Sequence, residues 1–203
     1  MTGTTLRYTS APFGKATTIA GPMAATIYAA SSNTNLELIA TLEDVAPDGT
    51  VTQITRGVLL GSFRALDRSR SWLDARRLLV RAVHPFDVEQ PVPANTVQRY
   101  DIGLDPTLWR IAAGNALRLV LSTQATASDC GVSLTLTKAQ PCLYTDAQRA
   151  VLSGGVYQIE RGRRHASVIN VPLVSPKALA TAASDVTPTS NGLTEPLDWD
   201  SGG

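Results

Sequence analysis

A catalytic serine in a hydrolase of the α/β type needs a G-x-S-x-G turn, which thrusts the serine out between a strand and a helix. The nearest approach is GVSLT at residues 131–135, which lacks the final glycine. It opens GVSLTLTK at 131–138, where apolar and polar residues alternate as in a strand. The chain has no glycine-rich phosphate loop or dinucleotide fingerprint either. The sequence therefore predicts no catalytic residue and no cofactor site.

The two histidines are the remaining candidates for a general base. His84 precedes Pro85-Phe86 in an irregular segment, and His165 lies in RGRRHAS between two expected strands. Neither has a serine or cysteine nucleophile that the sequence places beside it. We therefore expect both to be surface or hydrogen-bonded structural histidines.

Three carboxylates near one turn could supply oxygen ligands to Ca²⁺, namely Glu43, Asp44 and Asp48. Asp48 is better explained as part of a Pro-Asp-Gly turn, because proline fixes φ, aspartate can bond its own backbone and Gly49 supplies positive φ. The sequence predicts no metal site here.

Cys130 and Cys142 are the only cysteines, and no histidine lies near them, so a zinc site is not expected. Two interpretations stay open. Free buried thiols would agree with a cytoplasmic protein. A disulfide would contribute about 3 kcal/mol on the chain-entropy model and would imply an oxidising, extracytoplasmic compartment.

Trp72 and Trp109 could form a platform on which a sugar ring stacks. Trp72, however, recurs with Ala75 and Leu79 at helical spacing, and Trp109 follows the end of an expected strand. We therefore favour packing in the core or against another domain for both tryptophans, with ligand contact as the alternative.

The composition excludes several classes of partner. The chain has 203 residues, a net charge of +1 and 17% charged residues, which gives no reason to expect nucleic acid. Arginines gather between residues 64 and 81, but aspartates stand among them, which predicts a solvated, salt-bridged face. No apolar stretch is long enough to span a membrane, and the given N-terminus has no signal-peptide pattern.

Alternating apolar residues indicate a chain made mostly of strands. The segments expected as strands are 6–10, 17–20, 23–31, 35–45, 51–64, 99–104, 116–122, 131–138, 156–159 and 168–174, with 108–115 leading into the seventh. Short helical segments are expected at 69–79 and 145–152. We predict an all-β antiparallel sandwich of jelly-roll or Greek-key type over residues 1–175, with one or two short helices in loops. Residues 176–203, rich in Ala, Ser, Thr, Pro and Gly, are expected to form a flexible tail.

Several segments, taken in order, carry a family resemblance. They are LRYTSAPF at 6–13, ELIATLEDVAPDGT at 37–50, ITRGVLLGSFR at 54–64, RYDIGLDPT at 99–107, IAAGNALRLVLST at 111–123 and GGVYQIERG with HASVINVPLV near the end. Together they resemble the C-terminal domain of the X-prolyl dipeptidyl-peptidase and cocaine-esterase class of serine hydrolases, over about residues 4–175.

The resemblance implies a jelly roll with a galactose-binding-like fold. In that class it follows an α/β-hydrolase domain with a Ser-Asp-His triad and a helical cap, packs on both and helps to wall the active-site cleft. The catalytic residues belong to those other domains, so none is carried over to this chain. Residues 122–145 depart from the class, with two cysteines and no Phe-Pro, and Asn115 stands where a histidine is common.

We therefore expect an accessory, non-catalytic domain whose partner is a hydrolase domain of the same parent chain. An independent carbohydrate- or ligand-binding module is the alternative, and a sandwich used for assembly is a third hypothesis. The choice between peptide and ester substrates lies outside this sequence, as does the oligomeric state.

Overall fold

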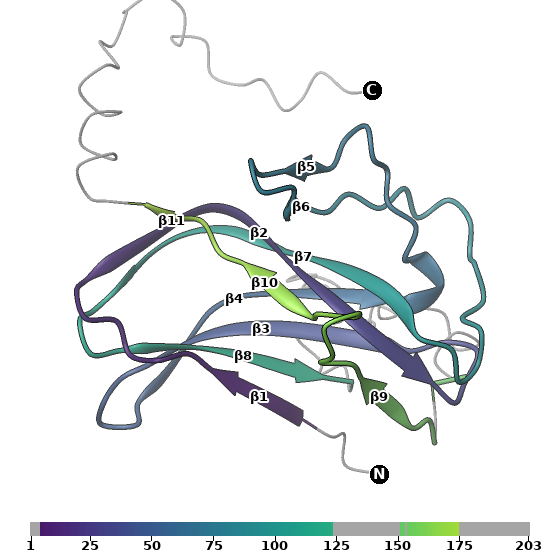
Figure 1. Cartoon of the computed structure of the whole chain (residues 1–203), viewed down its shortest axis with the longest axis horizontal. Coiled ribbons are helices and arrows are strands. Elements are labelled where there is room, and N and C mark those ends of the chain that lie inside the picture. Colours follow the sequence, from purple (N-terminus) through teal and green to yellow (C-terminus); the bar gives the residue numbers. More distant parts are fainter. Residues whose placement is uncertain (1–4, 124–150, 153, 175–203) are drawn as a thin grey trace, which may run out of the picture.

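The computed structural model describes residues 5–123, 151–152 and 154–174, and this part of the chain is an antiparallel β-sandwich (Figure 1). The elements in chain order are β1 (Thr5–Thr9), β2 (Thr17–Ser31), β3 (Glu37–Val45), β4 (Val51–Leu60), the 3-10 turn η1 (Gly61–Phe63), β5 (Trp72–Leu73), β6 (Leu79–Arg81), β7 (Gln98–Ile111), β8 (Ala116–Ser122), β9 (Tyr157–Ile159), β10 (Val168–Asn170) and β11 (Leu173–Val174). None of the described segments is a helix long and apolar enough to cross a bilayer.

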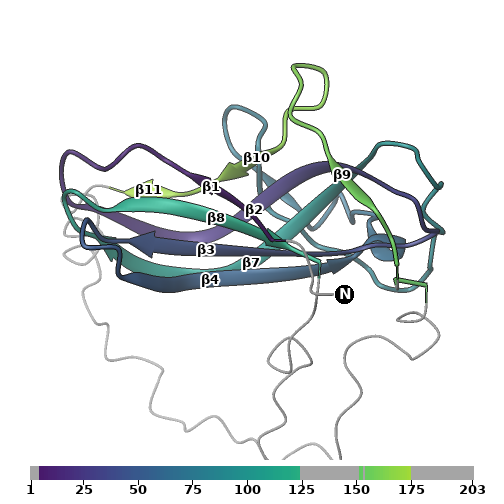
Figure 2. The same ribbon diagram turned by 90° about the horizontal axis from the view of Figure 1, so that it is seen from below.

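Two sheets form the layers of the sandwich, and Figure 2 shows the molecule from below, where strands of the two sheets overlap. The first has the order β1-β8-β3-β4. The second is centred on β2, which pairs with β7 along one edge and with β11, β10 and β9 in succession along the other. All these pairs are antiparallel, and β5 and β6 form a separate two-stranded hairpin. The predicted all-β sandwich is thus confirmed.

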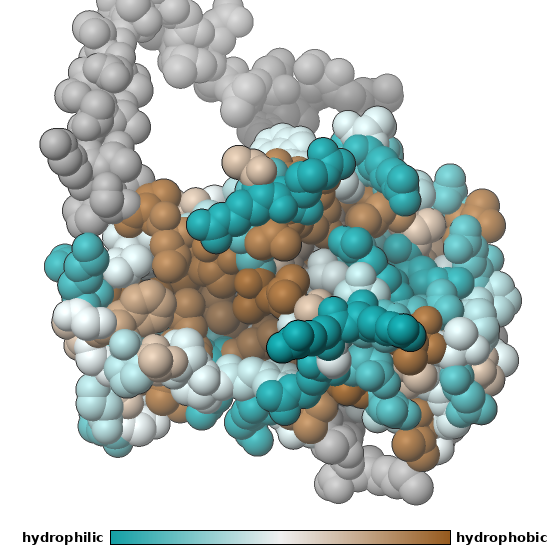
Figure 3. Space-filling view, viewed as in Figure 1, coloured by the Kyte–Doolittle hydropathy of each residue, from teal (hydrophilic) through white to brown (hydrophobic). Residues whose placement is uncertain are grey.

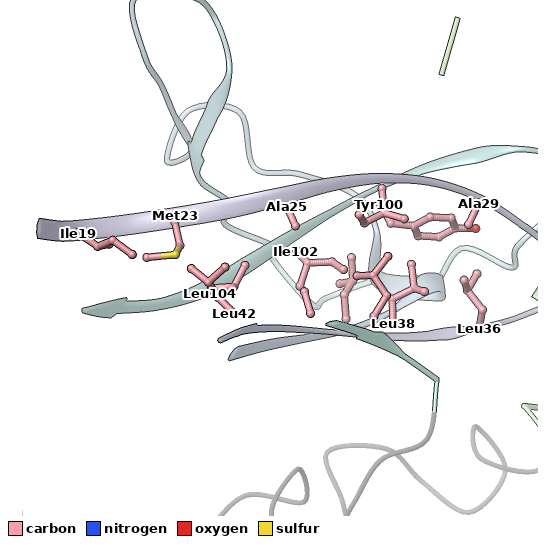
Figure 4. Close-up of a cluster of buried hydrophobic side chains, with 14 of the residues drawn as sticks. Ile19, Met23, Ala25, Ala29, Leu36, Leu38, Leu42, Tyr100, Ile102 and Leu104 are labelled. Atoms are coloured by element: carbon pink, nitrogen blue, oxygen red, sulfur yellow. The ribbon is translucent and has the colours of Figure 1, made fainter. Parts of the chain in front are cut away.

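The core lies between the sheets and follows the alternation read from the sequence. Side chains of β2 and β7 pack against those of β3 and of Leu36, which lies just before β3 (Figure 4). The buried residues that alternation predicted are Met23, Ala25, Ile27, Ala29, Leu36, Leu38, Ala40, Leu42, Tyr100, Ile102 and Leu104. The turn between β3 and β4 is also confirmed: Gly49 has φ 87°, and the Thr50 N–H donates to Asp48 Oδ1 at 2.9 Å.

Two strands were expected at 17–20 and 23–31, separated by Gly21-Pro22, and this prediction is wrong, because β2 runs unbroken from Thr17 to Ser31. Its register with β7 shifts between Gly21 and Met23, so that Pro22 faces two residues of β7, one of them Pro106. Proline cannot donate to a ladder, and a bulge is where a strand tolerates that loss. The same shift carries β7 past Pro106, which joins the two segments predicted separately.

The helix expected at 69–79 is also wrong. This segment forms the β5–β6 hairpin instead, in which Trp72 pairs with Arg81 and Leu73 with Leu79. Asp74 directs the turn, since its Oδ1 accepts hydrogen bonds from the N–H groups of Arg76 and Leu78. An aspartate that captures backbone donors in this way competes with a helix. The strand expected at 131–138, nearly all of the helical segment at 145–152 and the tail at 176–203 lie outside the described residues.

The sandwich is closed along one flank and open along the other. On the closed flank β4 crosses close to β7, and a Cβ added at Gly57 would run into the backbone of Gly103. On the open flank, a hollow of about 500 Å³ lies between β8 and β10. Leu119, Leu121 and Ile169 are among its lining residues, and apolar side chains gather in a hollow on the face shown in Figure 3.

The Tyr100 side chain lies in the core with no exposed surface, and its hydroxyl has no hydrogen-bond partner among the described residues. Burial raises the pKa of Tyr100 to about 12. Removing an unpaired buried hydroxyl is nearly neutral or stabilising. We therefore expect Tyr100→Phe to leave the free energy of unfolding at pH 7 unchanged, or to raise it by up to about 1 kcal/mol.

The pH dependence gives a second readout for this variant. An unfolded tyrosine loses its proton near pH 10, whereas folded Tyr100 keeps it until about pH 12. The contribution of protonated Tyr100 to the free energy of unfolding is therefore complete below pH 10, and it is lost as the pH rises from 10 to 12. Denaturant unfolding between pH 7 and pH 11.5 should show wild type losing more stability than the variant. A variant clearly less stable at pH 7 would contradict this account.

Candidate functional site

The segment between η1 and β7, residues 64–97, forms an excursion over the outer face of the second sheet (Figure 1). β6 packs on β2, and Ala82 lies over the backbone of β7, where a Cβ added at Gly103 would meet the Ala82 carbonyl oxygen at 3.3 Å. Asn170 of β10 donates to Asp74 Oδ2 at 3.2 Å, which ties the hairpin to the sheet. The excursion is therefore attached to the sandwich at several points.

Two aspartates shape the backbone of the excursion. Asp67 Oδ1 accepts from the Ser69 hydroxyl at 2.6 Å and from the N–H groups of Ser69 and Arg70. These bonds lower the pKa of Asp67, chiefly through the Ser69 hydroxyl, and the pKa of Asp74 is lowered chiefly by the Leu78 N–H. Both carboxylates are thus turn acceptors.

The arginine-rich run is mostly exposed, as expected, but the arginines and aspartates attract each other without direct salt bridges, as Arg70 does Asp67 and Arg76 does Asp74. None of the arginines between residues 64 and 81 forms an ion pair with a carboxylate in the described part of the chain. The aspartates among them bond backbone N–H groups instead. Arg77 has φ 61°, a left-handed conformation that costs a non-glycine residue about 1 kcal/mol. The guanidinium groups of Arg68 and Arg77 are thus left without a partner among the described residues.

His84 clamps the excursion to β7. Its Nδ1 lies 2.9 Å from the carbonyl oxygen of Ala65, and its Nε2 lies 2.8 Å from that of Asp101. Carbonyl oxygens only accept, so a neutral ring can donate to one of them, whereas the doubly protonated ring donates to both. Neither ring nitrogen contacts a serine or cysteine in the described residues. This geometry is that of a structural clamp.

The excursion also presents apolar side chains to solvent. Trp72 is 53% exposed, Phe86 59% and Val88 62%, and Leu73 and Leu78 are also exposed. The rings are held in place: Arg81 lies over Trp72 at 4.8 Å, and Phe86 packs edge-on against Phe63 with centroids 5.6 Å apart. We call the exposed side chains of Trp72, Leu73, Leu78, Phe86 and Val88 the apolar surface of the excursion. Exposed apolar side chains with ordered aromatic rings are features of interaction sites.

Trp109 lies elsewhere, near the end of β7. Its Nε1 donates to Asp44 Oδ2 at 2.9 Å, while Asn115 Nδ2 donates to Asp44 Oδ1 at 2.8 Å. The contact joins β3 of one sheet to β7 of the other. Trp72 and Trp109 belong to different elements, and no described ring contact joins them. The sequence analysis did not predict this contact of Asp44 with Trp109 and Asn115, although it identified Asn115 as a departure from the related class.

The other residues considered at the sequence level have separate local partners. Glu43 pairs with Arg118 at 2.7 Å, and Asp48 bonds its own turn. No cluster of three or more histidine, cysteine, aspartate or glutamate side chains that could hold a metal occurs in the ranges described. His165 stacks against Tyr28 at 5.2 Å. Cys130 and Cys142 lie outside the described residues, so both interpretations of their redox state stay open.

Comparison with known proteins identifies the family. Residues 2–129 match the family model described as the X-Pro dipeptidyl-peptidase C-terminal non-catalytic domain. The chain belongs to this family. A search of curated proteins found no match.

Solved structures share the fold of this family member at low sequence identity. A CocE/NonD family hydrolase from Staphylococcus aureus superposes with a TM-score of 0.64 and 18% identity, over 85% of this chain and 30% of that one. An aminopeptidase from a marine sediment Thaumarchaeota archaeon gives 0.60 and 14%, over 84% and 26%. An α-amino acid ester hydrolase gives 0.59 and 13%, over 84% and 25%. The chain therefore spans about a quarter to a third of each of these proteins.

Proposed function

We propose that this chain is the accessory, non-catalytic domain of an α/β-hydrolase-type serine hydrolase, either an X-Pro dipeptidyl-peptidase or an acyl esterase. It packs on the catalytic domain of the same parent chain and helps to shape the active-site cleft. The observation that carries the proposal is the family match, which covers residues 2–129 and names a non-catalytic C-terminal domain. The sandwich, on this proposal, is a jelly roll of the galactose-binding type spanning residues 1–175, and residues 176–203 form a flexible tail.

The apolar surface of the excursion is the docking face in this proposal. Five of the twelve large hydrophobic residues exposed in the described ranges lie between Trp72 and Val88. Exposed aromatic anchors that are already ordered lose little side-chain entropy on association, which favours tight packing of another domain on them. Arg81 already lies over the ring of Trp72. This favours a role for Trp72 in packing against another domain over a role in stacking on a sugar ring.

The first test concerns chemistry. The chain should show no turnover of X-Pro-anilide or p-nitrophenyl ester substrates, because the catalytic serine is proposed to belong to another domain. The reading frame upstream of residue 1 should encode an α/β-hydrolase domain with a G-x-S-x-G elbow. Turnover that serine-directed inhibitors abolish would sink the claim that this domain is inert on its own.

The second test concerns docking. With the hydrolase domain from the same gene supplied in trans, the double substitution Trp72→Ser/Phe86→Ser should weaken binding at least about 10-fold by calorimetry, as expected for two aromatic anchors. Leu108→Ser is the matched control, because Leu108 is 69% exposed but lies near the far end of β7. Equal affinities for the double variant and wild type, or an equal loss in the control, would exclude the excursion as the docking face.

A further inference from the structure

A second feature of the excursion is a hollow of about 770 Å³ beside the β5–β6 hairpin. Four arginines line it: Arg64 and Arg68 at the start of the excursion, Arg77 in the hairpin turn and Arg99 on β7. Ligand sites in proteins commonly have volumes of roughly 300–1,000 Å³. The hollow is therefore large enough for a small molecule, and positive charges predominate on its wall.

Asp101 is the single carboxylate lining the hollow, and its oxygens are already used. Oδ1 accepts from the Thr26 hydroxyl at 2.6 Å, and both oxygens lie about 3 Å from Arg99 Nε. Its carbonyl oxygen lies 2.8 Å from His84 Nε2. Asp67 and Asp74 stand in the same turns as Arg68 and Arg77, where they accept hydrogen bonds from backbone N–H groups. One carboxylate among four guanidinium groups leaves the hollow with an excess of positive charge.

The arginines differ in how they are held. The Arg64 guanidinium donates to the carbonyl oxygens of Gly61 at 3.1 Å and Gln90 at 2.6 Å, so its charge is fixed in place without being neutralised. The side chains of Arg68 and Arg77 are exposed, and neither guanidinium forms a hydrogen bond or ion pair with any described residue. Arg77 stands at φ 61°, where glycine would be free of strain. The turn thus places the positively charged Arg77 at a backbone conformation that glycine would adopt without strain.

We propose that this hollow binds a small anion carrying two or more negative charges, such as a phosphorylated compound or a polycarboxylate. The planar guanidinium fork donates paired hydrogen bonds that match phosphate and carboxylate oxygens, and two unpaired forks on a fixed cationic wall suit a multiply charged ligand. This binding goes beyond the docking role and can be tested on this chain alone. Leu73 belongs both to the apolar surface of the excursion and to the wall of the hollow.

The test is calorimetric titration of the full chain with pyrophosphate and, separately, with citrate, in 150 mM NaCl. At least one probe should bind, and Arg68→Gln and Arg77→Gly should each weaken its binding at least 10-fold. Pyrophosphate alone would indicate a phosphorylated ligand, citrate alone a polycarboxylate, and both a site for either. Arg77→Gly relieves the left-handed strain, so it is expected to fold.

Arg110→Gln is the control of equal charge. Arg110 lies on the same strand as Arg99 but roughly 35 Å away along it. It should leave binding unchanged. The proposal would be overturned if neither probe bound. It would also be overturned if Arg110→Gln weakened binding as much as the two hollow variants do, because general charge attraction would then explain the binding. Unfolding curves for each variant would confirm that a lost signal is not lost folding.

Discussion

Replacing Gly57 with alanine is expected to lower the free energy of unfolding by more than about 3 kcal/mol. Gly57 lies on β4 where that strand crosses β7 on the closed flank of the sandwich. A Cβ at this position would overlap the carbonyl oxygen of Gly103 and lie 2.8 Å from its carbonyl carbon. Both atoms belong to the backbone of a paired strand, so no side-chain rotation can relieve the clash. The two sheets would have to separate locally.

Gly14 and Gly162 offer matched controls. A Cβ at either position meets nothing within 4 Å, and neither has a positive φ. Their alanine variants should stay within about 1 kcal/mol of wild type, with any shift toward greater stability. Denaturant unfolding measures all three. If Gly57→Ala cost no more than Gly14→Ala, the close crossing of β4 and β7 would be wrong.

Gly103→Ala separates this crossing from general crowding. Its Cβ would meet the Ala82 carbonyl oxygen at 3.3 Å, a contact that a small shift of the excursion can relieve. A smaller loss is therefore expected, of about 1 kcal/mol. The order Gly57, then Gly103, then Gly14 is the signature of the geometry described above.

The strands of the two sheets could be predicted from sequence because their core-facing residues are apolar at alternate positions. Alternation at Leu36, Leu38 and Leu42 placed these three residues in the core correctly. The opposite face of β3 is covered as well, since Glu37 is 4% and Ile39 1% exposed, and the alternation did not predict this. The turn at Asp48-Gly49 was equally readable, because its chemistry is local. What failed was the assumption that Gly21-Pro22 ends a strand, because a bulge is decided by the partner strand.

The excursion could not be predicted for a related reason. Trp72, Ala75 and Leu79 have helical spacing, but only Leu79 is buried, and Asp74 closes a hairpin turn instead. Periodicity indicates a helix only where one face meets a core. Here tertiary contacts of β6 with β2 decide the conformation.

The partners of the polar side chains could not be predicted from sequence either, because they too depend on tertiary contacts. An aspartate between arginines can form ion pairs or bond backbone N–H groups, and Asp67 does the second. The meeting of Asp44, Trp109 and Asn115 depends on how two sheets stack, which no local pattern encodes.

Asn35 is the second position at which a single substitution should have a large effect. The residue is 4% exposed and lies between β2 and β3. Its Oδ1 accepts from the N–H groups of Leu36 and Ser62, both at 2.9 Å, and its Nδ2 donates to the Ser62 hydroxyl at 3.0 Å. One amide thus joins the start of β3 to η1, from which the excursion leaves the sandwich.

Asn35→Ala should lower the free energy of unfolding by about 3 kcal/mol, because two buried backbone donors lose their acceptor at once and each unpaired buried group costs roughly 1–3 kcal/mol. Denaturant unfolding measures the loss. Hydrogen exchange locates it, since the Ser62 and Leu36 amide protons should exchange faster than those in the middle of β3.

Asn170→Ala is the matched amide control. Asn170 is half-buried, and its two hydrogen bonds, to Asp74 and the Leu79 carbonyl, are long at 3.2 and 3.3 Å. It should cost no more than about 1 kcal/mol. Equal losses in the two variants would mean that Asn35 contributes no more to the free energy of unfolding than another partly buried amide. A larger loss at Asn35, with exchange concentrated at Ser62, would show that this one side chain fixes where the excursion begins, and with it the orientation of both the apolar surface and the arginine hollow.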